Sequence, residues 1–560
     1  MNVSSSKCLT LAMTCLVSLG ISPENVSALR APDTSICAQS NSLAFFKETA
    51  RPDNGGEAAG ERVKTDALGN TIVAGYLRGT VNFKQLVAVS SNGVTSCVRG
   101  RGLPTEQCAL TSNGGGDIFI EKFDVGGAPL WVKKFGGVGD DNVNSLAVDA
   151  ANGIIIGGGF SNTIDFGSSL PTLTTGMPWD GYVAKLSKDG QALWAKHLGK
   201  STFSNIFVNA VAVDATGAVF VAGSYAAPWV DLGSVDSKGV PILQPARVQD
   251  PTRPATDGFI NKFSSANGAP LWPLAKTLGG LGGDVVSSMA VDSMGNVIVG
   301  GYTYGVSDLS GENWPNLPLL HPQPFAGTSG ADSDVFFAKY SGSDGAYRWG
   351  HVYGSASPEV VYGLATDAAQ NIYIAGSFVA PFDLYDSSVP TPRPAVRITP
   401  TIGGAYSSYF AKINGAGVSQ WASVVGPQTG GMVIPRNIAA DAIGNLAITG
   451  IVSGDVIFRD GVVTNGNLNI YATKYDSQGR NIWAHRSSNQ GSNSARGITF
   501  DAFGGVLTTG WIQGPVLIYP LTAASPASNI KSPFLLKVNP PCNVVSDTTA
   551  TTVPAGLLAY

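Results

Sequence analysis

Acidic residues that precede recurring apolar segments are the first candidates for chemistry in this sequence. Carboxylates that converge on one point can bind a hard cation such as calcium through their oxygens. The charged residues at these places are Asp140, Asp141, Asp284, Glu359, Arg436 and Arg496. No D-x-D-x-D-G series accompanies them, and acids of solvated loops are the alternative. We therefore expect no cofactor and keep calcium as the candidate ion.

Three tryptophans lie in segments that vary along the chain, namely Trp179, Trp229 and Trp314. A tryptophan offers a large rigid apolar face that stacks on a sugar ring or anchors a protein partner. Trp229 precedes the turn Val-Asp-Leu-Gly, which is echoed at residues 164–167, so we expect it to be packed. Trp314 and Trp179 are the candidate ligand contacts, and Trp314 in Glu-Asn-Trp-Pro-Asn is the stronger one.

The histidines do not form an obvious catalytic constellation. Three of the four, His197, His351 and His485, follow a recurring tryptophan by two or three residues in different parts of the chain. Equivalent positions in different repeats point apart, so a metal cluster or a Ser-His-Asp triad is not expected. We assign no catalytic residue and no metal ligand.

A segment typified by SLAVDAANGIIIGGGF (residues 145–160) recurs seven times and organises the chain. Each copy has an aspartate followed nine residues later by a glycine. The aspartates are Asp66, Asp149, Asp214, Asp292, Asp367, Asp441 and Asp501. Alternating apolar residues around a D-x-x-G turn predict two antiparallel strands. Because all copies share the aspartate, we interpret it as a turn residue.

A second repeated segment follows each copy and predicts another hairpin, the third and fourth strands of a unit. Its marker lysines are Lys122, Lys185, Lys262, Lys339, Lys412, Lys474 and Lys537, and a tryptophan follows six of them. We expect each lysine to form an ion pair with the aspartate of its unit. The tryptophan is interpreted as a large apolar filler between adjacent sheets.

The order of the strands predicts a closed all-β fold. Six units contain four strands, whereas the seventh stops after its third strand near residue 540. The segment Ser42–Lys47 aligns with a fourth strand, with Phe45 in the place of the tryptophan. We therefore expect residues 41–540 to form a seven-bladed β-propeller with four-stranded antiparallel blades, in which the N-terminal strand completes the last blade.

Composition and the chain ends limit location and partners. The sequence holds 70 glycines, charged residues make up 13%, and the net charge of −4 predicts no nucleic-acid partner. Residues 1–28 have the pattern of a secretory signal, and no other stretch has the length and apolarity of a transmembrane segment. Residues 543–560 are expected to be a flexible tail. We expect a secreted or cell-envelope monomer.

Four cysteines remain after the signal, and an oxidising compartment favours their pairing. Cys97 and Cys108 are close in one loop and most simply pair with each other. Cys37 and Cys542 would then link the two ends of the propeller, where the last blade lacks its covalent turn. Closing so long a loop would stabilise the fold by on the order of 4 kcal/mol.

The combination of AVD-x-x-GN-type strands, x-F-x-x-K strands and a G-x-x-x-W hairpin resembles the bacterial β-propeller repeat family often called SBBP repeats. The resemblance covers about residues 41 to 540 and implies an extracytoplasmic propeller. KLSKDGQALW and KYDSQGRNIW also resemble the tryptophan-docking motif of pyrroloquinoline quinone propellers. Those enzymes usually have eight blades and often an adjacent cysteine pair, and this sequence has neither.

The function we expect is binding of a glycan or a protein partner, without catalysis. Variable loops on a rigid frame are where binding residues concentrate. The connections between second and third strands, and between a fourth strand and the next first strand, fall on one face, which we call the loop side. The alternative is an enzyme with a site in the axial funnel, either a quinone-linked oxidoreductase or a glycoside hydrolase or lyase.

Overall fold

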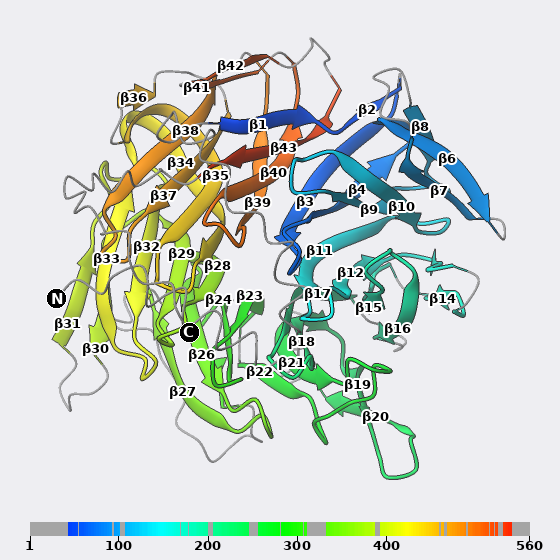
Figure 1. Ribbon diagram of the computed structural model, residues 1–560. Helices are drawn as coiled ribbons and strands as arrows, with labels where there is room; N and C mark the ends of the chain where they lie inside the picture. Colours follow the sequence, from blue (N-terminus) through cyan, green and yellow to red (C-terminus); the bar gives the residue numbers. More distant parts are fainter. Residues whose placement is uncertain are drawn as a thin grey trace, which may run out of the picture. The chain divides into compact units, whose positions relative to one another are not determined.

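The computed structural model describes residues 43–539 except 54, 92–93, 101–106, 168–169, 177, 200–204, 246–255, 281, 306, 311–331, 387–392, 459–460, 464–467, 489–490, 515, 520 and 525–529. Within these residues the chain forms antiparallel β-sheets and no helix, and so no helix that could span a membrane (Figure 1). The expected signal (1–28), the tail (543–560), Cys37, Cys542 and Trp314 lie outside the described residues.

Seven sheets of the described chain share one order of four principal strands, in which each strand pairs with the next. The first consists of β3 (Glu57–Thr65), β4 (Thr71–Arg78), β9 (Asp117–Phe123) and β10 (Pro129–Phe135). The next three are β11 (Asp141–Val148), β12 (Ile154–Phe160), β15 (Asp180–Leu186) and β16 (Ala192–Leu198); β17 (Asn205–Val213), β18 (Val219–Ala226), β21 (Asp257–Phe263) and β22 (Lys276–Gly280); and β23 (Asp284–Val291), β24 (Val297–Thr303), β26 (Asp334–Tyr340) and β27 (Tyr347–Tyr353).

The last three sheets follow the same order, and the final one borrows its fourth strand. They are β28 (Val360–Thr366), β29 (Ile372–Phe378), β32 (Ser407–Ile413) and β33 (Ser419–Val425); β34 (Pro427–Ala440), β35 (Leu446–Phe458), β37 (Asn469–Tyr475) and β38 (Asn481–Ser488); and β39 (Ser494–Phe500), β40 (Val506–Ile512), β43 (Ser532–Val538) and β1 (Leu43–Glu48). In Figure 1, β1 in blue lies beside β43 in red, and Phe45 is the register partner of Lys537.

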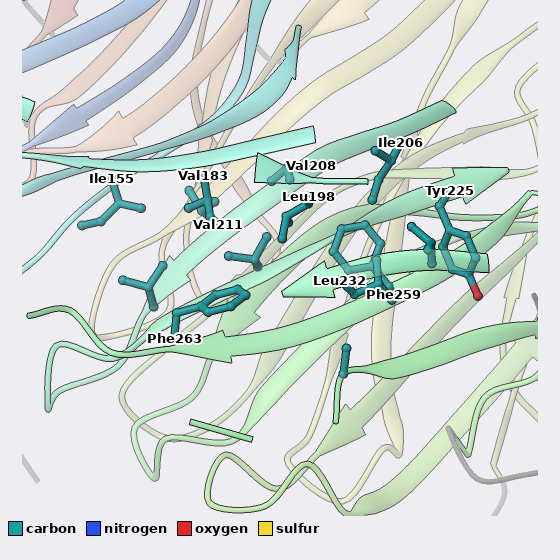
Figure 2. Close-up of a cluster of buried hydrophobic side chains, with 14 of the residues drawn as sticks. Ile155, Val183, Leu198, Ile206, Val208, Val211, Tyr225, Leu232, Phe259 and Phe263 are labelled. Atoms are coloured by element: carbon teal, nitrogen blue, oxygen red, sulfur yellow. The ribbon is translucent and has the colours of Figure 1, made fainter. Parts of the chain in front are cut away.

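The first strands of successive sheets contact one another. β3 contacts β11, and the contacts continue through β17, β23, β28 and β34 to β39, which in turn contacts β3. Apolar side chains fill the space between neighbouring sheets. Figure 2 shows one such cluster, in which Val183 and Leu198 of the second sheet meet Val208, Val211 and Phe259 of the third. These side chains are buried, and their removal from water favours the stacked arrangement.

The repeated aspartate has two roles in each unit. In the turn between β11 and β12, Asp149 Oδ1 accepts hydrogen bonds from the backbone N–H groups of Ala151 and Gly153, at 3.0 and 2.7 Å. Its other oxygen, Oδ2, lies 2.7 Å from Lys185 Nζ on β15. The turn assignment from the sequence is therefore correct, and the same side chain also fixes the third strand.

The expected ion pair is present in five of the seven units. The other four pairs, at 2.8 to 3.0 Å, are Lys122–Asp66, Lys262–Asp214, Lys339–Asp292 and Lys537–Asp501. The expectation was wrong for Lys412, because the hydroxyl of Tyr373 donates to Asp367 at 2.9 Å and Lys412 lies over the Tyr373 ring. It was wrong also for Lys474, whose ammonium donates to the Gly504 carbonyl at 3.0 Å.

The recurring tryptophans join each sheet to the next. Trp194 Nε1 donates to the Ser265 carbonyl at 2.9 Å, and its ring lies against Gly268 in the last turn of the third sheet. Trp272 and Trp349 make the equivalent hydrogen bonds to Gly342 and Gly415. The ring of Phe45 on β1 lies against Gly127 of the first sheet in the same manner.

Connections on the loop side form additional small sheets. They are β2 (Ala50–Pro52), β5 (Thr80–Lys84) and β8 (Gln107–Thr111); β13 (Thr163–Ile164) and β14 (Leu173–Thr174); β19 (Trp229–Val235) and β20 (Pro241–Pro245); and β30 (Phe382–Asp386) and β31 (Arg393–Ile398). Another hairpin, β6 (Leu86–Ser91) and β7 (Val94–Arg99), extends the first sheet beyond β10. A disulfide between Cys97 and Cys108 joins β7 to β8, as expected from the sequence.

Candidate functional site

The three acidic candidates Asp141, Asp284 and Glu359 are buried at the start of a first strand, not solvated in loops. Asp141 and Glu359 accept hydrogen bonds from the connections that precede them, from Gly137 N–H at 2.8 Å and from Ser355 N–H at 3.0 Å, and so hold the loops that lead into their first strands. Asp284 instead accepts a hydrogen bond from the hydroxyl of Ser307, which follows the second strand of the same sheet.

Burial decides the protonation of these three groups. Desolvation raises the pKa of Asp141 to about 8, with a smaller effect of nearby Asp117, and raises the pKa of Glu359 to about 8. The pKa of Asp284 is raised to about 6 by desolvation. Asp140, in contrast, is half-exposed and pairs with Arg78 at 2.6 Å. Among the described residues, no three His, Cys, Asp or Glu side chains gather to hold a metal ion.

The sequence placed Arg436 and Arg496 in connections between sheets. This was wrong, because they lie within the strands β34 and β39. Each is the extra residue of a β-bulge, which interrupts the register between the first and second strands. The same bulge occurs in all seven sheets, five residues before the repeated aspartate. The seven bulge residues are Glu61, Asn144, Asn209, Ser287, Tyr362, Arg436 and Arg496.

On one arc these residues connect neighbouring first strands. Asn144 Nδ2 donates to the Val208 carbonyl at 3.2 Å, and Asn209 Nδ2 donates to the Val286 carbonyl at 2.9 Å. The hydroxyl of Ser287 donates to Val361 at 2.5 Å. In each case the acceptor precedes the bulge residue of the next sheet. Short polar side chains thus satisfy backbone carbonyls between sheets.

On the other arc the bulge residues are larger, and they are the charged residues Glu61, Arg436 and Arg496 and the aromatic residue Tyr362. Together with Arg62, which follows Glu61, we call them the arginine cluster. Glu61 Oε2 lies 3.8 Å from Arg496 Nη1 and 3.9 Å from Arg62 Nη1. The guanidinium of Arg436 lies 5.5 Å from the centre of the Tyr362 ring. Its Nε is buried and has no hydrogen-bond partner within the described part of the chain.

The cluster carries more positive than negative charge. Three guanidinium groups face one carboxylate, so two positive charges are not balanced within it. Burial lowers the pKa of Arg436, and the charge of Arg496 lowers it further. Burial also lowers the pKa of Arg62, against the opposing effect of Glu61. Arg496 and Arg62 keep part of their side chains accessible, 37% and 28%, so a ligand can reach them.

The tryptophans differ from the expectation. Trp229 is 55% exposed on β19, and the expectation that it is packed was wrong. Exposed Leu243 and Val240 belong to the same small sheet or its turn. Trp179 is partly buried and its ring lies 5.6 Å from that of Phe207.

Two cavities lie at the small sheets and at the ends of the first strands. A groove of about 660 Å³ is lined by polar side chains of β2, β5 and β8, including Arg51, Asn82 and Lys84. A pocket of about 330 Å³ is lined by the last residues of all seven first strands, including Lys64.

Sequence reasoning missed Glu61, Arg62, Lys64 and Tyr362. A signal for Glu61 and Tyr362 was present, because the bulge residue stands at a constant five residues before the aspartate. Aligning the seven copies at that offset separates the short polar side chains from the charged and aromatic ones.

Comparisons with known proteins give limited similarity. No protein-family model matches the sequence. The chain is 24% identical over 331 residues to the uncharacterized WD repeat-containing protein L264 of Acanthamoeba polyphaga mimivirus, and the match covers 51% of this chain and 23% of that protein. The chain therefore matches less than a quarter of that relative's length.

Two solved structures align with this chain at low similarity. A protein of unknown function from Dyadobacter fermentans aligns with 88% of this chain and 99% of its own, at 8% identity and a TM-score of 0.35. The extracellular domain of a one component system from B. thetaiotaomicron aligns with 87% of this chain and 79% of its own, at 10% identity and a TM-score of 0.15.

Proposed function

We propose that this protein is a secreted or cell-surface β-propeller of seven four-stranded blades, which binds a glycan that carries an acidic group and does not catalyse a reaction. The seven sheets of equal strand order, their successive contacts and the similarity to a WD repeat-containing protein support the propeller. β1 is the fourth strand of the last blade. The resemblance to SBBP repeats, and a disulfide of the kind that persists in oxidising compartments, support an extracytoplasmic location.

The observation that carries the binding function is the arginine cluster. Residues shared by all seven blades build the frame, whereas a single binding site must use residues that differ between blades. At the bulge position, Tyr362, Arg436, Arg496 and Glu61 replace short polar residues on adjacent blades. Guanidinium groups bind carboxylate, sulfate or phosphate oxygens in a bidentate manner. The unpartnered Nε of Arg436 offers one such donor.

Several features favour a glycan over a folded protein partner and over an enzyme substrate. The bulge residues lie within the first strands, and Arg496 and Arg62 keep 37% and 28% of their side chains exposed. A single terminal acidic sugar needs only such partly exposed groups, whereas a folded protein partner needs a larger accessible surface. Glycoside hydrolysis uses two carboxyl groups, and the arginine cluster contains only Glu61.

An array of acidic and neutral glycans tests this proposal on the purified secreted chain. We expect saturable binding of glycans that bear carboxylate or sulfate groups, and a loss of about tenfold or more in affinity for Arg436→Gln or Arg496→Gln. Arg397→Gln is the matched control, because Arg397 lies on β31 with a 61% exposed side chain paired with Asp383. A Trp314→Ala variant tests the loop tryptophan in the same array.

Two outcomes would contradict the proposal. Equal binding of neutral glycans, or unchanged affinity in folded Arg436→Gln and Arg496→Gln proteins, would remove the cluster as the site. An array without any binding, together with capture of a protein from the cell surface by the wild type and not by Arg496→Gln, would move the function to a protein partner.

A further inference from the structure

The pocket formed by the ends of the first strands differs in character from the arginine cluster. Its volume is about 330 Å³, and residues just before the seven repeated aspartates line it. Most of these are apolar, such as Leu146, Val213, Met289 and Phe500. Pockets of this size and composition, with a few placed polar groups, are typical of sites for small molecules.

One strong cation breaks the pattern of the pocket wall. Two residues before the repeated aspartate, five of the seven strands carry alanine and β39 carries Thr499, but β3 carries Lys64. Lys64 lines the pocket and remains exposed to it. No ion pair or hydrogen bond of its ammonium group is found in the part of the chain that the structure describes.

The surroundings of Lys64 add positive charge and no compensating carboxylate. Surrounding protein lowers the pKa of Lys64, and the charge of Arg62, two residues earlier on β3, lowers it further. Arg62 itself lies beside Glu61. A carboxylate that pairs with Lys64 would offset the repulsion between its ammonium group and the charge of Arg62.

We propose that this pocket binds a small organic monocarboxylate, whose carboxylate pairs with Lys64 and whose apolar part contacts the valine and alanine side chains of the wall. The site adjoins the arginine cluster: Lys64 stands two residues beyond Arg62 on β3, about 7 Å along an extended strand. The inference uses Lys64 and the pocket wall alone, so it does not depend on the glycan proposed above.

The wall decides between an organic and an inorganic anion. An inorganic phosphate or sulfate must replace its hydration with several donors, and the lining side chains other than Lys64 supply only hydroxyls such as those of Thr65, Thr366 and Thr499. An alkyl carboxylate has a smaller free-energy cost of leaving water, because transfer of its apolar tail out of water is favourable. The single cation fits a single carboxylate.

Calorimetric titration of the purified full chain with hexanoate tests this site, with 1-hexanol and inorganic phosphate as probes that lack the charge or the apolar tail. We expect hexanoate to bind, and both other probes to bind at least about tenfold more weakly. Lys64→Met should weaken hexanoate binding by about tenfold or more, whereas Lys64→Arg should retain it. Lys188→Met, at an exposed lysine paired with Asp189, is the matched control.

The outcomes separate this site from the arginine cluster. Failure of hexanoate to bind the wild type at millimolar concentration, or equal binding by a folded Lys64→Met protein, would overturn the inference. Equal binding of phosphate and hexanoate would replace the organic ligand by a simple anion site and would also overturn it. Loss of acidic glycan binding in Arg496→Gln with hexanoate binding intact would show that two sites exist.

Discussion

At the scale of single residues, the same side chain types serve opposite purposes according to their partners. Asp149 is buried as an anion because backbone N–H groups and Lys185 surround it. Glu359 is equally buried but accepts hydrogen bonds from Ser355 and has no cation beside it, so its pKa rises to about 8. A buried carboxyl group therefore keeps its charge only where a partner compensates for the loss of hydration.

Breaking the Lys185–Asp149 pair is expected to lower stability, mainly because it would leave a buried carboxylate without its cation. Lys185→Met removes the ammonium and leaves the Asp149 carboxylate 3% exposed without its cation. Breaking a buried pair in this way costs about 3 kcal/mol. Chemical denaturation should detect this as a lower free energy of unfolding. Lys188→Met, which breaks a pair with side chains 59% and 67% exposed, should change little, and equal effects of both variants would contradict the prediction.

Glu359 predicts a specific pH dependence of stability. Its pKa rises from an ordinary value of 4.5 in the unfolded chain to about 8 in the folded protein. Its contribution to stability is therefore complete below pH 4.5 and is lost as the pH rises to about 8. Glu359→Gln lacks this titration, so the difference in melting temperature, variant minus wild type, should increase from pH 5 to pH 8.5. A difference that is constant or decreases over this range would refute the raised pKa.

The repeated residues could be predicted from the sequence, whereas the residues of the arginine cluster could not be recognised as a group. Asp149 and its equivalents occur in every copy, which indicates a structural role. The bulge shifts the register by one residue, and alternation alone does not reveal where the extra side chain points. Arg436 and Arg496 were singled out, but Glu61 and Tyr362, which complete their surroundings, were not.

At the scale of the elements, neighbouring sheets are joined through a tryptophan and a glycine turn. In five of the seven joints, a tryptophan on or just before the fourth strand of one sheet lies against a glycine with positive φ in the last hairpin turn of the next sheet. At Gly268, φ is +67°, and an added Cβ would approach Trp194 to 2.9 Å. The glycine is needed both for the turn and for the close approach of the indole.

Substitution at this turn separates the two requirements. Gly268→Ala adds strain from positive φ and displaces Trp194, whereas Gly239→Ala has φ +80° and nothing within 4 Å of the added Cβ. We expect Gly239→Ala to cost about 1 kcal/mol of stability. Gly268→Ala should cost about 1 to 3 kcal/mol more, from overpacking, and should change the fluorescence of Trp194. Equal costs would show that the indole does not depend on this turn.

The strands themselves follow from alternation and turn chemistry, and the small sheets on the loop side do not. The sequence predicted the hairpins because D-x-x-G turns and period-two patterns recur. The turn after Trp229 has a counterpart at residues 164–167, and both aspartates bridge the preceding fourth strand, but this echo does not extend to Trp229 itself, whose expected packing was wrong. Whether the Trp229 side chain is buried depends on which other segments pack against the β19–β20 sheet, and the local sequence does not encode that.

At the scale of the whole described domain, the two ends of the chain meet in one sheet. β1 pairs with β43 across residues far apart in sequence, and Lys47 Nζ donates to the Gly127 carbonyl of the first sheet at 2.8 Å. A pairing of such sequence separation requires a large loss of chain entropy. The Cys37–Cys542 disulfide expected from the sequence would reduce that loss, and mass mapping of the non-reduced protein should find the two cysteines linked. A free Cys37 thiol would refute it.

A circular permutant tests whether the last sheet needs only the strand β1 beside β43, or also needs β1 to begin the chain. The register places Leu43 opposite Val538, so a hairpin turn can join the end of β43 to the start of β1. In the first sheet, residues 124–128 make the equivalent turn between Phe123 and Pro129. A chain of residues 49–538 followed by a copy of residues 124–128 and then residues 43–48 should therefore fold and melt close to the wild type.

The same chain without residues 43–48 is the control for that permutant. It leaves one edge of β43 unpaired and removes the contacts of Phe45 and Lys47 with Gly127, which join the last sheet to the first. An unpaired apolar edge pairs with other chains, so we expect a lower melting temperature and concentration-dependent association. Addition of a synthetic peptide of residues 43–48 should partly restore the melting temperature. A deletion variant as stable and monomeric as the permutant would mean that β1 covers the edge without closing the fold.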